Sequence, residues 1–102
     1  MSGHRVVCGD FAHGQDPDEE WAVDGFRTEE AAAEYARRFV RDQIEGLRDA
    51  YADAAALNEV FFAFGEYALA PGFDLKSWVA HCIATPAVRR AETDYQAIEP
   101  HA

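Results

Sequence analysis

The chain has 102 residues, with 19 acidic residues against 9 lysines and arginines, so its formal net charge at pH 7 is −10. This charge opposes electrostatic attraction to nucleic acid and to anionic membranes, and no run reaches the ~18 apolar residues of a membrane span. We therefore expect one domain over residues 1–102, located in the cytoplasm because no signal-peptide segment is recognisable, that binds neither nucleic acid nor membrane.

Two strands are predicted at the start of the chain. Residues 5–12 read as an extended segment with Val6 and Cys8 on one face. Residues 13–20 combine glycine, proline and acidic residues, which is the composition of a turn, and a second strand begins at Trp21. The two strands should form an antiparallel hairpin with a long acidic loop.

A long amphipathic helix is predicted over residues 28–51, with Thr28 as its N-cap. Its opposite face carries arginines interleaved with acids, for example Glu34 one turn before Arg38, so we interpret that face as solvated and self-paired. Gly46 interrupts the helix and indicates either close packing or a kink. The apolar positions recur every three or four residues, and they are Ala33, Ala36, Val40, Ile44, Leu47 and Tyr51.

The segment after this helix is ambiguous. Residues 50–58 are rich in alanine and predict either a continuation of the long helix or a second short helix. We favour a buried strand over residues 59–69, ended by Pro71, although a helix is the alternative. The preference for a strand rests on four residues, Val60, Phe61, Phe62 and Phe64.

The last third of the chain predicts two helices. Asp74 can cap the first of them. Its apolar positions follow helical spacing, and they are Leu75, Trp78, Val79, Cys82 and Ile83. Thr85 and Pro86 are typical of an N-cap and a first helical position, so they predict a short final helix that Pro100 stops.

Together these elements predict an α+β fold. It consists of a small antiparallel three-stranded sheet, in the order β-β-α-β, covered by one long helix, with one or two C-terminal helices. Cys8 and Cys82 are the only cysteines, and neither has a second cysteine at zinc-ligand spacing. We therefore expect two reduced thiols, no metal and no cofactor.

Short motifs are spread in a fixed order over residues 5–83. They are Phe11-Ala12-His13, the run from Gly25 through Thr28 to Ala31, Arg38 and Val40, Phe64-Gly65-Glu66, and Phe73 with Trp78. Their order resembles a group of small, uncharacterised bacterial proteins that share a strand–acidic loop–strand–helix start, a later Phe-Gly-Glu and a helix bearing tryptophan. The chain departs from that group at Tyr67, which replaces an acid. The resemblance implies the order of elements and no activity.

The acidic loop invites a calcium or magnesium hypothesis, because hard cations bind several oxygen ligands. The spacing of Asp16, Asp18 and Glu20 imitates the start of an EF-hand loop. However, Trp21 stands where that loop requires glycine, and Pro17 stiffens the turn. We interpret the segment as a solvated loop.

Three residues carry the alternative function, which is a small enzyme or a metal-binding protein. If residues 59–69 form a strand beside residues 5–12, we expect Glu66 near Asp10 or His13. An imidazole with carboxylates can transfer protons, and the same three groups can bind a transition metal. The alternative therefore needs all three side chains to converge.

Exposed aromatic side chains carry the leading function. A three-stranded sheet with one helical layer leaves one face uncovered, so some rings should form a partner surface. We expect a non-catalytic protein-binding or regulatory module whose acidity favours a basic protein partner. The unpaired sheet edges also allow a homodimer. The candidate partner-binding residues are Trp21, Phe61, Phe62, Tyr67 and Trp78.

Overall fold

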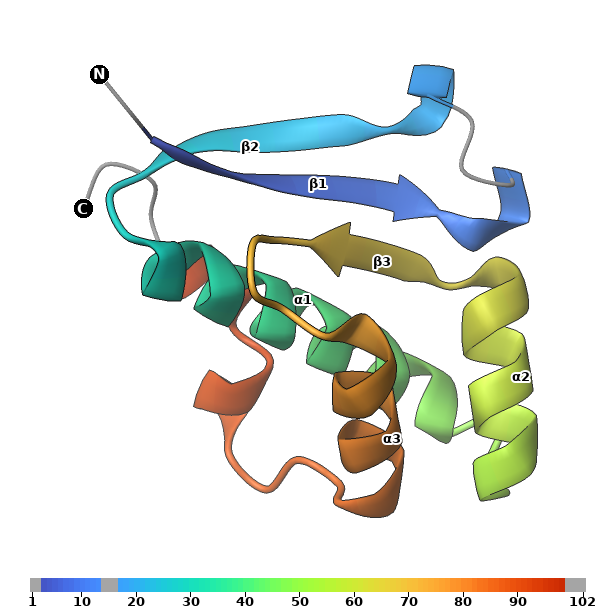
Figure 1. Cartoon of the computed structure of the whole chain (residues 1–102). Helices are drawn as coiled ribbons and strands as arrows, with labels where there is room; N and C mark the ends of the chain where they lie inside the picture. The colour runs from blue at the N-terminus through green and yellow to red at the C-terminus, as the bar shows by residue number, and fades with distance from the viewer. Residues whose placement is uncertain (1–2, 14–16, 99–102) are drawn as a thin grey trace.

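The computed structural model describes residues 3–13 and 17–98 (Figure 1). Its strands and helices are β1 (His4–Asp10), β2 (Trp21–Phe26), α1 (Glu29–Arg48), α2 (Ala54–Phe64), β3 (Glu66–Leu69) and α3 (Leu75–Ala84). Short 3-10 turns occupy Phe11–His13, Pro17–Glu19, Arg90–Glu92 and Tyr95–Ala97. The predicted α+β class is confirmed. Of the helices in these described ranges, none has the length and apolar character needed to cross a bilayer.

β1 is the central strand of the sheet, whose order is β2-β1-β3 with both pairings antiparallel. The predicted hairpin is confirmed, and Cys8 lies opposite Trp21 within it. β1 ends at Asp10 rather than at residue 12. The reason is that the chain enters a 3-10 turn there, and the amide of Phe11 donates to the carbonyl of Gly65 at 3.0 Å.

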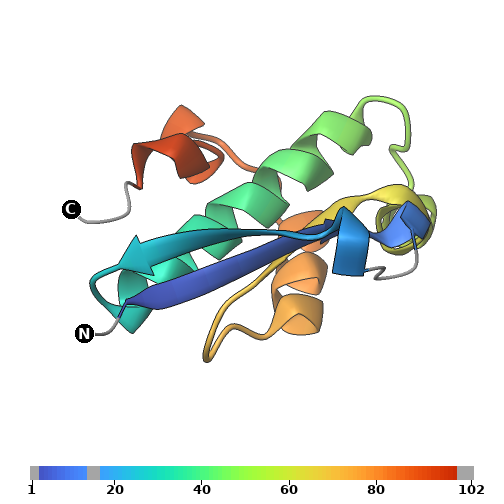
Figure 2. The ribbon, with the colours of Figure 1, turned by 90° about the horizontal axis from the view of Figure 1, so that it is seen from above.

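α1 covers one face of the sheet (Figures 1 and 2). Thr28 caps it as predicted, because its Oγ1 accepts a hydrogen bond from the amide of Ala31 at 3.0 Å. The helix ends at Arg48, before residue 51, and runs unbroken through Gly46. A Cβ added at Gly46 would meet no atom within 4 Å, so close packing does not explain this glycine. The side chains that face the sheet are Ala32, Ala36, Phe39, Val40 and Ile44.

The arginine-bearing face of α1 is only partly the solvated, self-paired face that we expected. Arg38 does pair with Glu34, with Nε and Oε2 2.8 Å apart. Arg41, however, is 3 % exposed, and its Nη1 donates to the carbonyl of Thr85. Arg48 donates to two carbonyls of the last turn of α3, at 2.7 and 3.2 Å. These arginines therefore satisfy backbone carbonyls that the end of a helix leaves without partners.

The strand predicted over residues 59–69 is wrong for most of its length, because α2 extends to Phe64 and β3 has only four residues. The side chain of Asp53 accepts a hydrogen bond from a first-turn amide at 3.0 Å, which gives α2 its N-cap. Helical spacing then buries Leu57 and Phe61 one turn apart. This burial outweighs the β-propensity of the aromatic run. The second short helix, one of our two alternatives, is the one that forms.

α3 begins at its predicted N-cap, where Asp74 Oδ1 accepts a hydrogen bond from a first-turn amide at 3.2 Å. The final α-helix predicted from Thr85 is wrong, since the chain forms only 3-10 turns there. Glu92 Oε2 accepts hydrogen bonds from the amides of Val88 and Arg89, at 3.0 and 2.9 Å. These bonds fold the chain into a tight turn before an α-helix can begin.

Residues 85–98, which we call the C-terminal segment, lie along α1 (Figure 2). The ring of Tyr95 packs edge-on against Tyr35 and Phe39 of α1, with centroids 5.4 and 5.0 Å apart. Arg38 Nη1 donates to the carbonyl of Asp94 at 3.2 Å. The segment is therefore held to α1 by side chains rather than by helix packing.

Candidate functional site

Two of the three residues in the predicted enzyme or metal site meet in the structure. Asp10 and Glu66 lie opposite each other where β1 pairs with β3. Asp10 Oδ1 accepts from the amide of Ala12 at 2.7 Å, and the amide of Glu66 donates to Gln43 Oε1 at 3.1 Å. The side chain of His13 lies outside the described part of the chain. Within the described residues, no group of three or more His, Cys, Asp and Glu side chains could hold a metal ion.

The two cysteines offer no nucleophile at neutral pH. Both are free and fully buried. Burial, and then the charge of Glu66, raise the pKa of Cys8 to about 12, and burial raises the pKa of Cys82 to about 11. Because the thiolate is the reactive form, both thiols remain inert and pack as small apolar groups.

Tyr67 connects the sheet to the acidic loop. Its ring lies across Gly9, and its hydroxyl donates to Glu20 Oε2 at 2.8 Å. Burial and this hydrogen bond raise the pKa of Tyr67 to about 12. Glu20 is thus engaged within the fold, Asp18 lies in a 3-10 turn, and Asp16 lies outside the described residues. The described part of the loop does not present the acids as one ligand set.

The five aromatic residues predicted to contact a partner lie in different environments. Phe61 and Tyr67 are buried in the core and cannot form an exposed surface. Phe62 and Trp78 are partly buried, and Trp78 Nε1 donates to a backbone carbonyl of α1 at 2.9 Å. Trp21 is 43 % exposed and packs edge-on against a ring of α1. Of the five, Trp21 alone is a strongly exposed side chain.

Two further exposed aromatic side chains lie at the two ends of α2. Phe64, the last residue of the helix, is 69 % exposed, and Tyr51, in the α1–α2 connection, is 40 % exposed. Both line one groove of about 230 Å³, which we call the α2 groove. Its lining consists of Tyr51, Ala56, Glu59, Val60, Ala63 and Phe64.

Sequence reasoning missed the α2 groove because it assigned Tyr51 to the long helix and Phe64 to a strand. The signal that could have found it is Asp53, an N-cap residue followed by three alanines. A helix that begins there places three apolar side chains about one turn apart along the groove. They are Ala56, Val60 and Ala63.

The surroundings of the α2 groove are acidic. Residues 49–75 include five acids and no lysine, arginine or histidine. Asp49 and Asp53 are exposed and lie within two residues of Tyr51, and Glu59 lines the groove itself. The site is therefore an apolar strip with negative charge at its margin.

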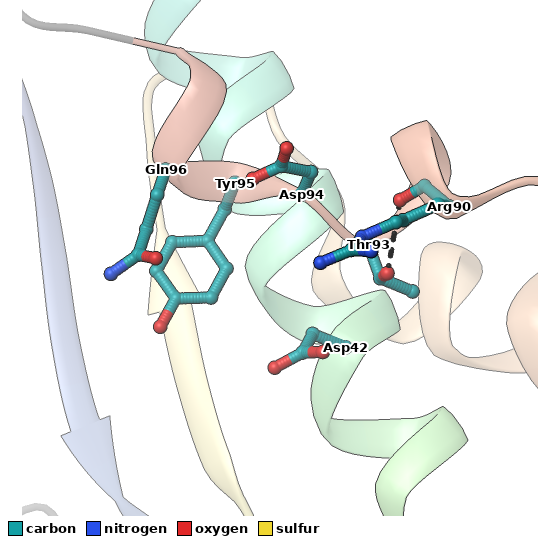
Figure 3. A pocket seen from close by; sticks show the side chains of 6 residues that line it. All are labelled: Asp42, Arg90, Thr93, Asp94, Tyr95 and Gln96. Carbon is teal, nitrogen blue, oxygen red and sulfur yellow. Dashed lines mark hydrogen bonds between the residues drawn. The ribbon is translucent and has the colours of Figure 1, made fainter.

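A second hollow, of about 250 Å³, lies between α1 and the C-terminal segment (Figure 3). Figure 3 shows the carboxylates of Asp42 and Asp94 on different sides of it, with Arg90 reaching between them. Burial raises the pKa of Asp42, and burial followed by the charge of Asp42 raises the pKa of Tyr95. Because carboxylates and a guanidinium share this open hollow, its charges favour no single ligand class.

Comparisons of the chain with protein-family models, with curated proteins and with solved structures find no match. The resemblance to small bacterial proteins therefore stays a prediction. Among the described residues, the α2 groove combines two exposed aromatic side chains with an acidic margin.

Proposed function

We propose that the protein is a non-catalytic docking module that binds a basic, amphipathic segment of a partner protein in the α2 groove. The observation that carries this proposal is the pair of exposed rings, Phe64 at 69 % and Tyr51 at 40 %, along one groove. Aromatic side chains are enriched at interface centres, and fully burying one contributes about 1.5–3 kcal/mol. A partner that covers both rings therefore gains a strong apolar anchor.

The charge around the groove favours a basic partner. Asp49, Asp53 and Glu59 are exposed at or beside it. Complementary charges speed encounter and reject partners of the wrong sign. A helix laid along a groove presents apolar side chains one turn apart, which matches an apolar strip running along α2. The partner we expect is thus a helix with one apolar face and lysine or arginine on its flanks.

The two thiols contribute no reactive group to the α2 groove. Cys8 and Cys82 have pKa values raised to about 12 and about 11, so neither is a thiolate at neutral pH. Neither thiol lines the α2 groove, whose only charged lining residue is Glu59. The groove offers contact area rather than reactive groups.

The test is a titration with a fluorescent helical peptide that carries leucine in an i, i+3, i+4 pattern and lysine elsewhere. We expect saturable binding, measured by fluorescence anisotropy, that weakens as salt rises. Phe64→Ser should weaken it at least about tenfold, which is about 1.4 kcal/mol. Val88→Ser is the matched control, because Val88 is 87 % exposed and lies outside the groove.

Three results would contradict the proposal. The first is equal binding by the wild type and by Phe64→Ser, which would place the peptide elsewhere. The second is equal binding of a peptide with glutamate in place of lysine, which would remove the role of charge. The third is a dimer of the protein alone, seen by sedimentation, that Phe64→Ser dissociates. That result would make a second copy the occupant of the groove.

A further inference from the structure

α1, α3 and the C-terminal segment meet on the side of α1 away from the sheet (Figure 1). Side chains of these three parts line a small hollow. It measures about 70 Å³, and we call it the arginine pocket. Three guanidinium groups and two carboxylates line it, and two further carboxylates, Glu30 and Glu45, lie beside Arg37 and Arg41 from outside the lining. The lining residues are Glu34, Arg37, Arg38, Arg41, Trp78 and Glu92.

Arg41 lines this pocket with donors that the protein does not use. Its side chain is 4 % exposed, and Nη1 donates to the carbonyl of Thr85. Nη2 lies 3.7 Å from Glu92 Oε1, which is too far for a hydrogen bond. Nε is buried without a hydrogen-bond partner among the described residues. Since buried polar groups in folded proteins are nearly always hydrogen-bonded, this guanidinium calls for an acceptor.

Arg37 and Arg38 add further donors beside it. They hold Glu34 between them, because Oε1 accepts from Arg37 Nε at 2.9 Å and Oε2 accepts from Arg38 Nε at 2.8 Å. Arg37 Nη2 also binds Glu30, and Arg38 Nη1 donates to the carbonyl of Asp94. Arg37 Nη1 and Arg38 Nη2 make no hydrogen bond to any residue in the described ranges.

The acids of the pocket are already engaged. Both oxygens of Glu34 accept from arginines, and Glu92 Oε2 accepts from the amides of Val88 and Arg89. Among these carboxylate oxygens only Glu92 Oε1 accepts no hydrogen bond from a described residue, so most of the unused hydrogen-bonding capacity belongs to the arginines. What the pocket lacks is an acceptor with several oxygen atoms.

Trp78 forms the apolar wall of the pocket. Its Nε1 donates to the carbonyl of Arg37 at 2.9 Å, which fixes the indole ring. The guanidinium carbon of Arg41 lies 5.3 Å from the centre of that ring. The ring shields one side of the guanidinium from water, and hydrogen bonds to charged groups are stronger where water is excluded.

We propose that the arginine pocket binds one tetrahedral oxyanion, phosphate, as the free ion or as the phosphoryl group of a small molecule. Guanidinium groups bind phosphate oxygens through pairs of N–H donors. A tetrahedral anion presents oxygens in several directions, so it can accept from Arg37, Arg38 and Arg41 together. Pockets for drug-sized ligands measure roughly 300–1,000 Å³. This hollow measures only about 70 Å³, so we expect it to admit a single small group.

The test follows the side-chain Nε–H signals of the arginines by NMR while sodium phosphate is added at constant ionic strength. We expect saturable shifts of the Arg38 and Arg41 signals and none of the Arg5 and Arg27 signals. A parallel titration with O-phosphoserine separates the two sources. Saturation by phosphate alone indicates the free ion, and saturation by both indicates a phosphoryl group. Equal drift of all arginine signals, or no saturation, would overturn the proposal.

Variants locate the binding. Arg38→Gln should weaken phosphate binding at least about tenfold, and Arg38→Lys should restore only part of it, because an ammonium lacks the paired donors. Arg27→Gln removes the same charge from an exposed position outside the pocket and should bind as the wild type does. If Arg38→Gln binds phosphate unchanged, the pocket is not the site. The titration of the wild type decides the question if that variant does not fold.

Discussion

The ring of Tyr67 fills the space above Gly9. The two residues lie opposite each other in the β1–β3 pairing, and a Cβ at position 9 would fall 2.2 Å from Tyr67 Oη and 2.4 Å from its Cζ. The tyrosine hydroxyl then reaches Glu20, which precedes β2, at 2.8 Å. Tyr67, on the edge strand β3, thus reaches across the central strand β1 to the residue before β2, the other edge strand. Its ring fits there only because position 9 is glycine.

We predict that Gly9→Ala lowers the free energy of unfolding by about 1–3 kcal/mol, the usual cost of forcing extra volume into a packed site. Urea unfolding measures the change. Gly46→Ala is the matched control, because a Cβ there meets no atom within 4 Å and alanine favours the helix by about 1 kcal/mol. Equal effects of the two substitutions would contradict this account of Tyr67.

Local signals in the sequence were enough to predict most helix starts and the hairpin. Thr28 and Asp74 are N-caps in the structure as predicted, because a cap depends on neighbouring residues alone. The cap at Asp53 went unrecognised, and β-propensity then favoured a strand where α2 forms. The error reflects a competition between local preference and the burial of Phe61, which only the tertiary structure settles.

The arginine pocket lay beyond sequence reasoning for a different reason. The alternation of charges on the long helix is the same for a solvated face and for a buried one. Arg41 is buried because Thr85 and Glu92, 44 and 51 positions later in the chain, fold back onto it. Nothing within the helix itself encodes that contact. The final α-helix failed for a local reason, since Glu92 accepts hydrogen bonds from the amides of Val88 and Arg89 and holds that part of the chain in a turn.

We predict that stability falls as the pH rises above 9. The pKa of Cys82 is raised from 9.0 to about 11 by burial, so between these values the folded thiol keeps a proton that the unfolded chain loses. The neutral buried thiol makes its whole contribution to the free energy of unfolding below pH 9. That contribution, about 2–3 kcal/mol, is lost as the pH rises towards 11. Urea unfolding from pH 7 to pH 11, with reductant, should show a flatter profile for Cys82→Ala. An unchanged slope would contradict the assignment to this thiol.

We predict that Arg41→Met loosens the C-terminal segment. The substitution removes the donor to the Thr85 carbonyl and the positive charge beside Glu92, and losing such a bond costs about 1–3 kcal/mol. Hydrogen exchange of the amides in residues 86–98 should become faster. Arg37→Met is the control, since its ion pairs are partly exposed and such pairs contribute no more than about 1 kcal/mol. Uniform faster exchange over the whole chain would instead indicate global destabilisation.

We predict that Glu66→Gln stabilises the protein. Asp10 and Glu66 are two acids directly opposite each other on neighbouring strands, and like charges in that position are unfavourable by roughly 0.2–1 kcal/mol. The gain in stability should shrink as salt screens the repulsion between the two carboxylates.

Glu59→Gln removes the same charge from an exposed helical position and controls for the net charge of −10. A larger gain from Glu66→Gln than from Glu59→Gln would show a carboxylate pair kept at a cost to stability, as functional sites often are. A loss of stability would instead show that Glu66 is a structural acceptor, and the enzyme or metal alternative would lose its one structural support.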